Sequence, residues 1–173
     1  MIQGIVYTSN TGNTEKYAKH LGEKLSLPVY TLEDAKRSMG KGTPIIYLGW
    51  IMASGIKGYK DAQKNFCVRM VCAVGMGQTG TQQKEIREKN QIPASIEVFT
   101  LQGGFDMQRL RGINRFMMNM VSKTMTKSIE EKTDRTPEDE DMLDLLKNGG
   151  SRVSLEHLAE PIRWYEQNES REK

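Results

Sequence analysis

The residues best suited to chemistry form one short run near the start of the chain, Ser9-Asn10-Thr11-Gly12-Asn13-Thr14. Five of the six carry a side-chain hydroxyl or amide, and Gly12 has no side chain. The run lies between a predicted strand and a predicted helix, where free backbone N–H groups and the positive end of the helix dipole attract an anion. The sequence therefore predicts a phosphate-binding loop, the alternative being an ordinary capped turn. The run matches neither the G-x-x-x-x-G-K-S/T nor the G-x-G-x-x-G nucleotide-binding pattern.

Other residues that often carry chemistry are not arranged for it. His20 and His157 fall on predicted helices with no Ser or Cys arranged around them as a triad would require. Cys67 and Cys72 are five residues apart, which matches no zinc or redox-dithiol spacing, and we expect buried, reduced thiols. The four consecutive acids at 138–141 lack calcium-loop spacing, and we expect them to place negative charge at a helix N-terminus.

The phosphate loop must be positioned by the elements on either side of it, and these repeat along the chain. Short apolar runs rich in β-branched residues predict strands at residues 4–8, 28–32, 44–49, 70–75 and 96–101. Helices are expected between them at residues 14–25, 32–39, 54–65 and 79–90. Several strands are apolar at consecutive positions, as in parallel strands covered on both faces. Five successive βα units predict an α/β fold with an open, parallel, doubly wound sheet and helices on both faces.

The pattern changes after the fifth strand, where an extra helical segment is expected at about residues 107–150. Residues 107–126 predict a basic amphipathic helix, followed by a polar linker at 127–135. A second helix has clear boundaries, with Thr136 as N-cap, Pro137 at its first position and Gly149 after its end. A last helix with Ser154 as N-cap is expected to close the sheet, with Pro161 as a kink. The apolar stripe of the basic helix is Met107, Leu110, Ile113, Met117, Met120 and Val121, with Arg111, Arg115, Asn119 and Ser122 opposite.

The segment from Tyr7 to Glu15 resembles the phosphate loop of the flavodoxin family, S/T-x-T-G-x-T followed by an amphipathic helix. The order of βα units is also similar to the flavodoxin fold, a five-stranded sheet of order 2-1-3-4-5 that holds FMN at the switch point between its first and third strands. The resemblance covers residues 1–105. It implies one non-covalently bound FMN, with its 5′-phosphate on Ser9, Asn10, Thr11, Gly12, Asn13 and Thr14.

The same resemblance implies that the loops after the third and fourth strands surround the isoalloxazine ring. Trp50 is expected to stack on the ring or to lie at its edge, the alternative being a side chain packed under the loop. A backbone carbonyl within residues 53–55 is expected to turn toward flavin N5, which tunes the redox potential. Residues 75–83 contain no aromatic side chain, so one ring face is expected to be open or covered by Met76 alone. The ring-binding residues implied in this way are Trp50, Ile51, Met52, Ala53, Gly75, Met76 and Gly77.

The resemblance implies a flavodoxin-type electron carrier or FMN-dependent oxidoreductase, in which the flavin does the chemistry and no side chain is catalytic. Electron-carrier flavodoxins are typically acidic, whereas residues 1–127 hold 18 Lys or Arg against 9 Asp or Glu, a net charge of +9. The segment Gly103-Gly104-Phe105-Asp106, with the basic helix after it, is similar to the branch that includes menaquinone-dependent protoporphyrinogen oxidase. That likeness implies a quinone-linked flavoprotein that oxidises a protoporphyrinogen-like substrate at the membrane surface. A flavin-free interaction module with the same fold is a third alternative.

The partner is accordingly expected to be a redox protein or a quinone. The basic helix at 107–127 is expected to make a peripheral contact with anionic membrane, the alternative being that its methionines belong to the core. A nucleic-acid partner is not expected, because aromatic residues make up 7% of the chain and only Phe105 and Phe116 lie near the basic helix.

Length and composition limit the remaining classes. At 173 residues and a net charge of +3, the chain is expected to form one domain over residues 1–173. Its longest uncharged stretch, residues 42–56, includes three glycines and is shorter than the roughly 20 apolar residues that cross a bilayer. The start of the chain has no basic region or cleavage site of a secretory leader, so we expect a cytoplasmic protein.

Overall fold

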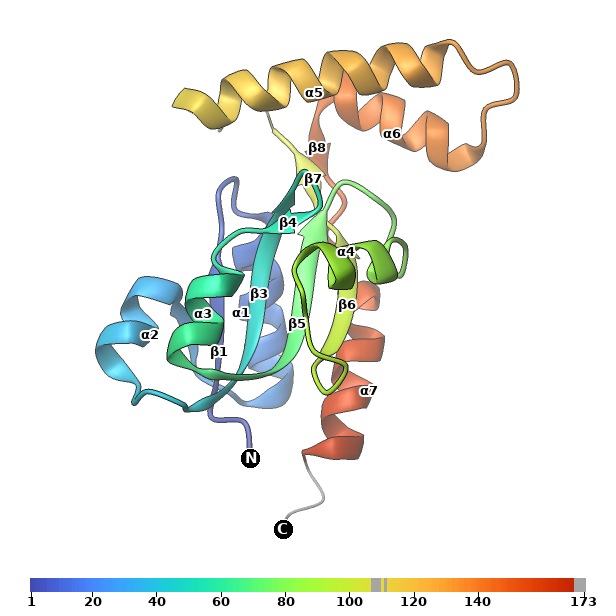
Figure 1. Ribbon diagram of the computed structural model, residues 1–173. Helices are drawn as coiled ribbons and strands as arrows, with labels where there is room; N and C mark the ends of the chain where they lie inside the picture. Colours follow the sequence, from blue (N-terminus) through green and yellow to red (C-terminus); the bar gives the residue numbers. More distant parts are fainter. Residues whose placement is uncertain (107–109, 111, 170–173) are drawn as a thin grey trace.

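The computed structural model describes residues 1–106, 110 and 112–169, and its centre is a parallel β-sheet (Figure 1). The strands run in the order β2-β1-β3-β5-β6, and the short β4 pairs antiparallel with the end of β3. With β4 left aside, this is the predicted 2-1-3-4-5 order, so the α/β, doubly wound fold is confirmed. The strands are β1 (Gly4–Thr8), β2 (Val29–Thr31), β3 (Pro44–Met52), β4 (Gly55–Ile56), β5 (Cys67–Gly75) and β6 (Glu97–Gln102).

Helices cover both faces of the sheet (Figure 1). One buried cluster joins α2, α3 and α4 to one face, and a second joins α1 and α7 to the other. The helices are α1 (Asn13–Leu25), α2 (Leu32–Ser38), α3 (Tyr59–Asn65), α4 (Gln83–Lys89) and α7 (Ala159–Asn168).

The centre of β3 shows why its sequence is apolar without alternation. Ile45 and Tyr47 belong to one buried cluster, whereas Ile46 and Leu48 belong to the other. All four side chains have no exposed surface, because successive residues of a strand point to opposite faces and both faces are covered.

The helix predicted at residues 54–65 begins only at Tyr59. The preceding residues Gly55–Ile56 form β4 and pair with the end of β3. The turn between these two strands consists of Ala53 and Ser54, whose φ angles of 48° and 59° lie in the left-handed region. A two-residue strand after a turn without glycine carries no periodic signal, which is why the sequence pattern assigned it to the helix.

Two other helix boundaries also differ from the prediction. The helix expected at 79–90 begins at Gln83. The basic helix expected at 107–126 is α5 (Gly112–Glu130); Leu110 precedes it and is not helical, and the helix extends into the predicted linker. The predicted helix residues Met107, Arg109 and Arg111 lie outside the described part of the chain.

The predicted boundaries of the next helix, α6 (Pro137–Asn148), are confirmed. The Thr136 hydroxyl accepts a hydrogen bond from the Asp139 N–H, and the Asp139 carboxylate accepts one from the Thr136 N–H. Such a reciprocal capping box satisfies two N–H groups that the helix itself leaves unpaired. At the other end, Gly149 adopts a φ of 70° and ends the helix.

The predicted N-cap of the last helix is also confirmed, but the helix has two parts. The Ser154 hydroxyl accepts from the Glu156 N–H and caps a short 3₁₀ turn, Leu155–Leu158, from which α7 continues. Pro161 lies in the first turn of α7, where a backbone N–H has no helical acceptor, so it does not need to kink the helix.

The two cysteines differ in environment. Both are free thiols; Cys72 is buried, but Cys67 at the start of β5 is exposed, so the expectation of two buried thiols is wrong for Cys67. Burial raises the pKa of the Cys72 thiol to about 12, which keeps that thiol protonated at neutral pH.

The α5–α6 helical hairpin is joined to the sheet through two short strands, β7 (Gly104–Phe105) and β8 (Gly150–Ser151), which pair antiparallel (Figure 1). A Cβ atom on Gly104 would lie 2.3 Å from the Gly150 carbonyl oxygen and 2.9 Å from Nδ2 of Asn13. A Cβ on Gly103 would lie 2.6 Å from Cγ1 of Val74. Two glycines are therefore needed where β7 crosses the phosphate loop and the end of β5.

Tyr17 connects α1 to the end of β6 and to the segment before α7. Its hydroxyl donates to the Gln102 carbonyl oxygen at 2.5 Å, and it accepts from the Ser154 N–H at 3.4 Å. Nδ1 of His157 lies 2.5 Å from the same oxygen. Because the single hydroxyl proton goes to Gln102, His157 donates from Nδ1. Burial raises the pKa of Tyr17 to about 12.

Replacing Gly104 with Ala is expected to lower the free energy of unfolding by about 1–3 kcal/mol, the usual range for overpacking. The midpoint of urea denaturation measures this change. Gly40→Ala is the matched control, because a Cβ there meets only the Thr43 hydroxyl at 3.7 Å. Equal midpoints for the two variants would show that the crossing has room for a side chain.

Replacing Tyr17 with Phe is expected to cost about 1–3 kcal/mol, because three partners lose a hydrogen bond. The substitution also changes the pH dependence of stability. The hydroxyl ionises near pH 10 in the unfolded chain and near 12 in the folded protein, so its contribution to stability is lost as the pH rises from 10 to 12. Urea denaturation across this window should show a smaller decline for Tyr17→Phe than for the unmodified protein. If the stability of both proteins declined equally over this pH range, the raised pKa of Tyr17 would be contradicted.

Candidate functional site

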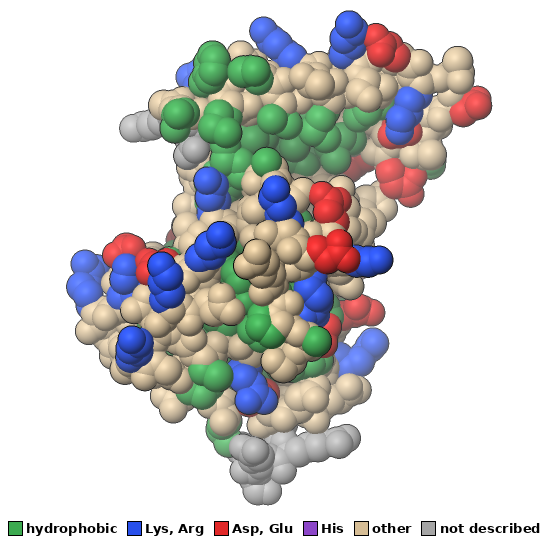
Figure 2. Space-filling view, viewed as in Figure 1, with side chains coloured by type: hydrophobic (Ala, Val, Ile, Leu, Met, Phe, Trp, Pro, Cys, Tyr) green, Lys and Arg blue, Asp and Glu red, His purple; other side chains and the backbone are tan. Residues whose placement is uncertain are grey.

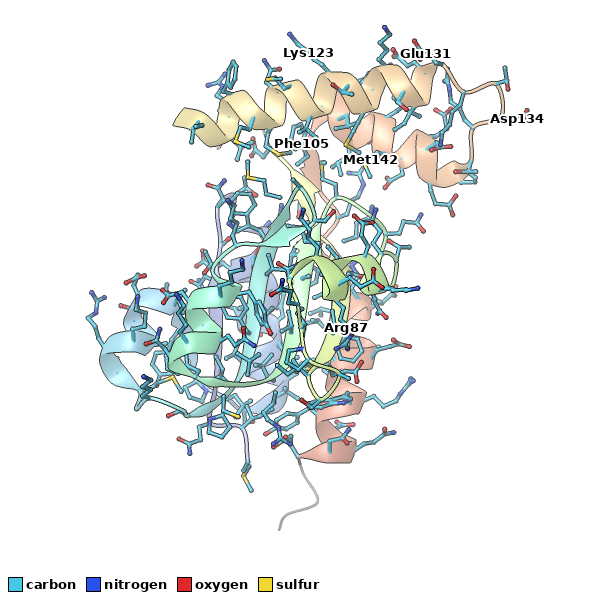
Figure 3. All side chains as sticks on the ribbon, in the orientation of Figure 1. Arg87, Phe105, Lys123, Glu131, Asp134 and Met142 are labelled. Carbon is cyan, nitrogen blue, oxygen red and sulfur yellow. The ribbon has the colours of Figure 1, made fainter. Side chains whose placement is uncertain are left out.

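A cavity of about 270 Å³ lies at the carboxyl ends of the parallel strands. Loops that follow β1, β3 and β5 form one side, and side chains of α5 and α6 form the other. Figure 3 shows Phe105 and Met142 where the helical hairpin meets the sheet. In doubly wound sheets, ligands bind at this edge, where neighbouring strands such as β1 and β3 send their chains to opposite sides.

The structure brings together most of the residues that the sequence assigned to cofactor binding. The predicted residues that line the cavity are Asn10, Thr11, Asn13, Thr14, Trp50, Ile51, Met52, Ala53, Gly75, Met76 and Gly77. The other two predicted residues are Ser9 and Gly12, which are not among the lining residues; the Ser9 hydroxyl accepts from the Gly12 N–H at 3.2 Å and so shapes the loop from within. Binding itself stays a prediction for all of them.

The phosphate loop ends at the first turn of α1. Gly12, at the N-cap with a φ of 94°, has no side chain to cap the helix, so the first-turn N–H groups remain available to an external acceptor. Asn13 is buried, and its side chain donates to the Thr11 hydroxyl at 3.5 Å and accepts from the Ser151 hydroxyl at 2.9 Å. The loop is thus held from one side by β8.

Trp50 lies at the end of β3, half-buried, and lines the cavity. Nζ of Lys57 lies 5.7 Å from the centroid of its ring, within the range of a cation–π contact. Below this segment, the Tyr47 hydroxyl donates to the Lys57 carbonyl oxygen at 2.6 Å and lies 2.8 Å from the Thr8 hydroxyl. Burial raises the pKa of Tyr47, so this hydroxyl stays protonated and joins the end of β1 to the segment after β4.

The methionine-rich side of the cavity was not predicted as part of the site. Met117, Met118 and Met125 of α5 and Met142 of α6 line the cavity opposite Met52 and Met76 of the strand-end loops. The expectation of a ring face that is open or covered by Met76 alone did not include this side of the cavity, to which the helical hairpin adds four methionines. Thioether side chains are flexible and polarisable and adapt well to flat apolar ligands. The sequence signal is the cluster of methionines between residues 107 and 125, whose helical stripe by itself predicts a core or membrane face.

Several other lining residues were also missed by sequence reasoning. Gly104, Phe105, Asp106 and Leu110 reach the cavity because β7 crosses the strand ends, a long-range pairing with no local signal. The remaining ones are Val74, Gln82 and Val121. Ser54 also lines the cavity and lies within residues 53–55, where a backbone carbonyl is expected to face the ring.

The helical hairpin is fastened over the cavity by polar contacts. Nε2 of Gln102 donates to the Asp141 carboxylate at 2.8 Å and to the Met76 carbonyl oxygen at 3.4 Å. The Arg152 guanidinium donates to the same carboxylate at 2.9 Å and pairs with Asp144. These two carboxylates raise the pKa of Arg152, while Asn148 and Arg152 lower that of Asp144. Asp141 therefore has a specific role, beyond the predicted negative charge at a helix N-terminus.

The apolar stripe of α5 is largely exposed to solvent. Ile113 and Met120 of the stripe expose 74% and 59% of their surface, and Phe116, which lies beside the stripe, exposes 65%. Figure 2 shows hydrophobic side chains on the outside of this helix. Helices α5 and α6 contact each other. Ser122, which the sequence placed on the polar side of α5, is buried, whereas Arg115 and Asn119 of the same side are exposed. The stripe is expected either to contact a membrane or to belong to the core, and the core alternative is wrong for the described residues of α5. Leu110, which precedes the helix, is buried against Phe105 and Leu145.

Within the described ranges, none of the helices is both long enough and apolar enough to span a bilayer. The same residues contain no group of three or more His, Cys, Asp or Glu side chains placed to hold a metal ion.

Comparison with known proteins adds one match to these observations. A family model described as a flavodoxin domain matches residues 4–134, about three quarters of the chain. The match spans the phosphate loop, all five parallel strands and α5. A search of curated proteins finds no match. The fold, the position of the cavity and the extent of the family match agree, and the chain belongs to the flavodoxin family.

Proposed function

We propose that this protein binds one FMN non-covalently and transfers electrons between redox partners. Membership of the flavodoxin family supports a flavin-dependent role of this kind. The observation that carries the proposal is the convergence of the phosphate loop and the two predicted ring loops on a single cavity. FMN as the specific flavin, and a cytoplasmic location, are part of the proposal.

The residues present fit FMN at both ends of the cavity. At one end, the first turn of α1 offers backbone N–H groups beside the Thr11 and Thr14 hydroxyls, which suits a phosphate dianion. At the other end, the lining is mainly apolar, with Trp50 and several methionines, which suits a flat ring. A Cβ on Gly75 would lie 2.9 Å from Cδ1 of Ile51, so this glycine lets the two ring loops approach each other closely.

Bound FMN would supply one- and two-electron transfer, which no side chain can perform. The chain's own residues bind the phosphate, orient the ring and exclude water from it. Among the described residues lining the cavity, Asp106 alone has an ionisable side chain. This composition favours electron transfer over a mechanism in which the protein acts as acid or base.

We propose in addition that α5 contacts an anionic membrane surface. Besides its exposed apolar residues, the helix carries Arg115, Lys123 and Lys127, and it has no acid before Glu130. Figure 3 shows Lys123 pointing away from the sheet. Apolar side chains and basic groups on one helix are what binding to anionic lipid requires.

A redox protein as the partner stays a prediction, as does quinone-linked oxidation of a protoporphyrinogen-like substrate, for which the match to a flavodoxin domain gives no support.

Replacing Thr11 and Thr14 by Val, singly, is expected to weaken FMN binding at least about tenfold per hydroxyl, because charge-assisted hydrogen bonds contribute about 1.5–3 kcal/mol each. Quenching of flavin fluorescence on titration into the flavin-free protein measures the dissociation constant. Thr43→Val is the control, because that hydroxyl donates to the Gly40 carbonyl oxygen before β3, away from the cavity. If all three variants bind FMN as the unmodified protein does, the phosphate lies elsewhere.

Replacing Phe116 and Met120 together by Ser is expected to reduce cosedimentation with phosphatidylglycerol vesicles, because it removes exposed apolar surface from α5. Phosphatidylcholine vesicles and high salt should reduce binding of the unmodified protein as well, because both weaken the electrostatic attraction. Leu155→Ser is the control, since Leu155 is a large apolar side chain that is 51% exposed outside α5. Unchanged sedimentation of the double variant would remove the membrane proposal.

A further inference from the structure

The turn between β3 and β4 has a backbone conformation that its residues disfavour. Ala53 and Ser54 have φ angles of 48° and 59°, while Met52 pairs with Gly55 on either side of them. Two-residue hairpin turns with positive φ at both central positions strongly prefer Asn and Gly, because most other side chains collide with the backbone there. Two consecutive residues in this region persist only where their surroundings hold them.

The surroundings that hold this turn come from the end of α4. Asn90, which is 7% exposed, donates from Nδ2 to the Ser54 carbonyl oxygen at 2.8 Å and accepts at Oδ1 from the Ile56 N–H at 2.8 Å. Its second N–H donates to the Ile86 carbonyl oxygen at 2.8 Å, within its own helix. Both N–H groups of the amide and its carbonyl are thereby used, and two of the three bonds go to the hairpin. The Ser54 hydroxyl also donates to the Glu85 carboxylate.

The same turn is part of the cavity wall. Ala53 and Ser54 line the cavity together with the end of β3. Because the Ser54 carbonyl oxygen is bound to Asn90, it is directed toward α4. The orientation of the peptide group between Ser54 and Gly55 is therefore fixed by a side chain that is not itself among the lining residues.

We propose that Asn90 is a positioning residue for the flavin site: its amide holds the strained Ala53–Ser54 turn against the cavity and thereby sets the affinity for FMN and the reduction potential of the flavin. The inference rests on the proposed function. Polar backbone groups at a fixed distance from a flavin ring change its electronics, and a turn released from Asn90 relaxes toward conformations that Ala and Ser prefer. Asn90 acts through the turn and has no catalytic role.

The test compares Asn90→Ala with Asn65→Ala. Asn65 is a matched control, because its amide also bonds near the end of a helix, to the Asp61 carbonyl oxygen and carboxylate, and it does not line the cavity. Hydrogen exchange of the Ile56 amide is measured first, in the flavin-free proteins. The FMN dissociation constant and the midpoint potential, from anaerobic titration against a reference dye, are measured next.

For Asn90→Ala we expect faster exchange of the Ile56 amide, FMN binding weakened about tenfold, as one lost buried hydrogen bond implies, and a shifted midpoint potential. The control should leave all three unchanged. Adding Ser54→Gly should reduce the effect of Asn90→Ala, because glycine adopts the turn without help. Asn90→Ser, whose side chain is too short to reach both hairpin groups, gives the same test if the alanine variant does not fold.

Unchanged exchange of the Ile56 amide would overturn the proposal, because the turn would then hold without Asn90. Faster exchange with unchanged affinity and potential would also overturn it, because the turn would then not influence the flavin. Failure of the unmodified protein to bind FMN would instead overturn the proposed function, and the exchange measurement distinguishes that outcome because it needs no flavin.

Discussion

The close crossing at Gly103-Gly104 is the constraint on which the rest of the structure depends. The chain there passes within contact of Val74, Asn13 and Gly150, and no room is left for a Cβ atom on Gly103 or Gly104. The Gly103 N–H donates to the Gly75 carbonyl oxygen, and its own carbonyl accepts from the Arg152 N–H. This one crossing therefore fixes the phosphate loop, the end of β5 and the start of the helical hairpin relative to one another.

Because the crossing brings the hairpin above the strand ends, the site has two sides of different origin. The sheet side is built from the loops that follow β1, β3 and β5 and is held by short hydrogen bonds such as those of Tyr47. The hairpin side carries flexible methionine side chains. Two carboxylates of α6 fasten the hairpin, Asp141 to Gln102 and Arg152, and Asp144 to Arg152. One side defines where a rigid ligand lies, whereas the other adapts to its surface.

The sequence was informative wherever the signal is local. The strand order followed from five successive βα units, and the loop at residues 9–14 could be placed because it lies between β1 and α1. Prediction from the sequence failed where the structure depends on contacts between distant residues. The examples are β4, the pairing of β7 with β8, and the methionines that line the cavity. The exposed stripe of α5 shows most clearly what cannot be predicted from local sequence. Helical periodicity identifies an apolar face, but it does not say what covers that face. Ser122, predicted on the polar side of that helix, is buried, whereas Arg115 and Asn119 of the same side are exposed.

The antiparallel pair of β7 and β8 also makes the helical hairpin a module. Its entry and exit lie side by side, since Gly104 pairs with Ser151 and Phe105 with Gly150. The segment between them can change in length or sequence without shifting any strand of the parallel sheet, because both ends are fixed at the same point. The parallel sheet with its strand-end loops thus forms one structural unit, and the helical hairpin that covers the cavity forms a second unit attached to it at one place.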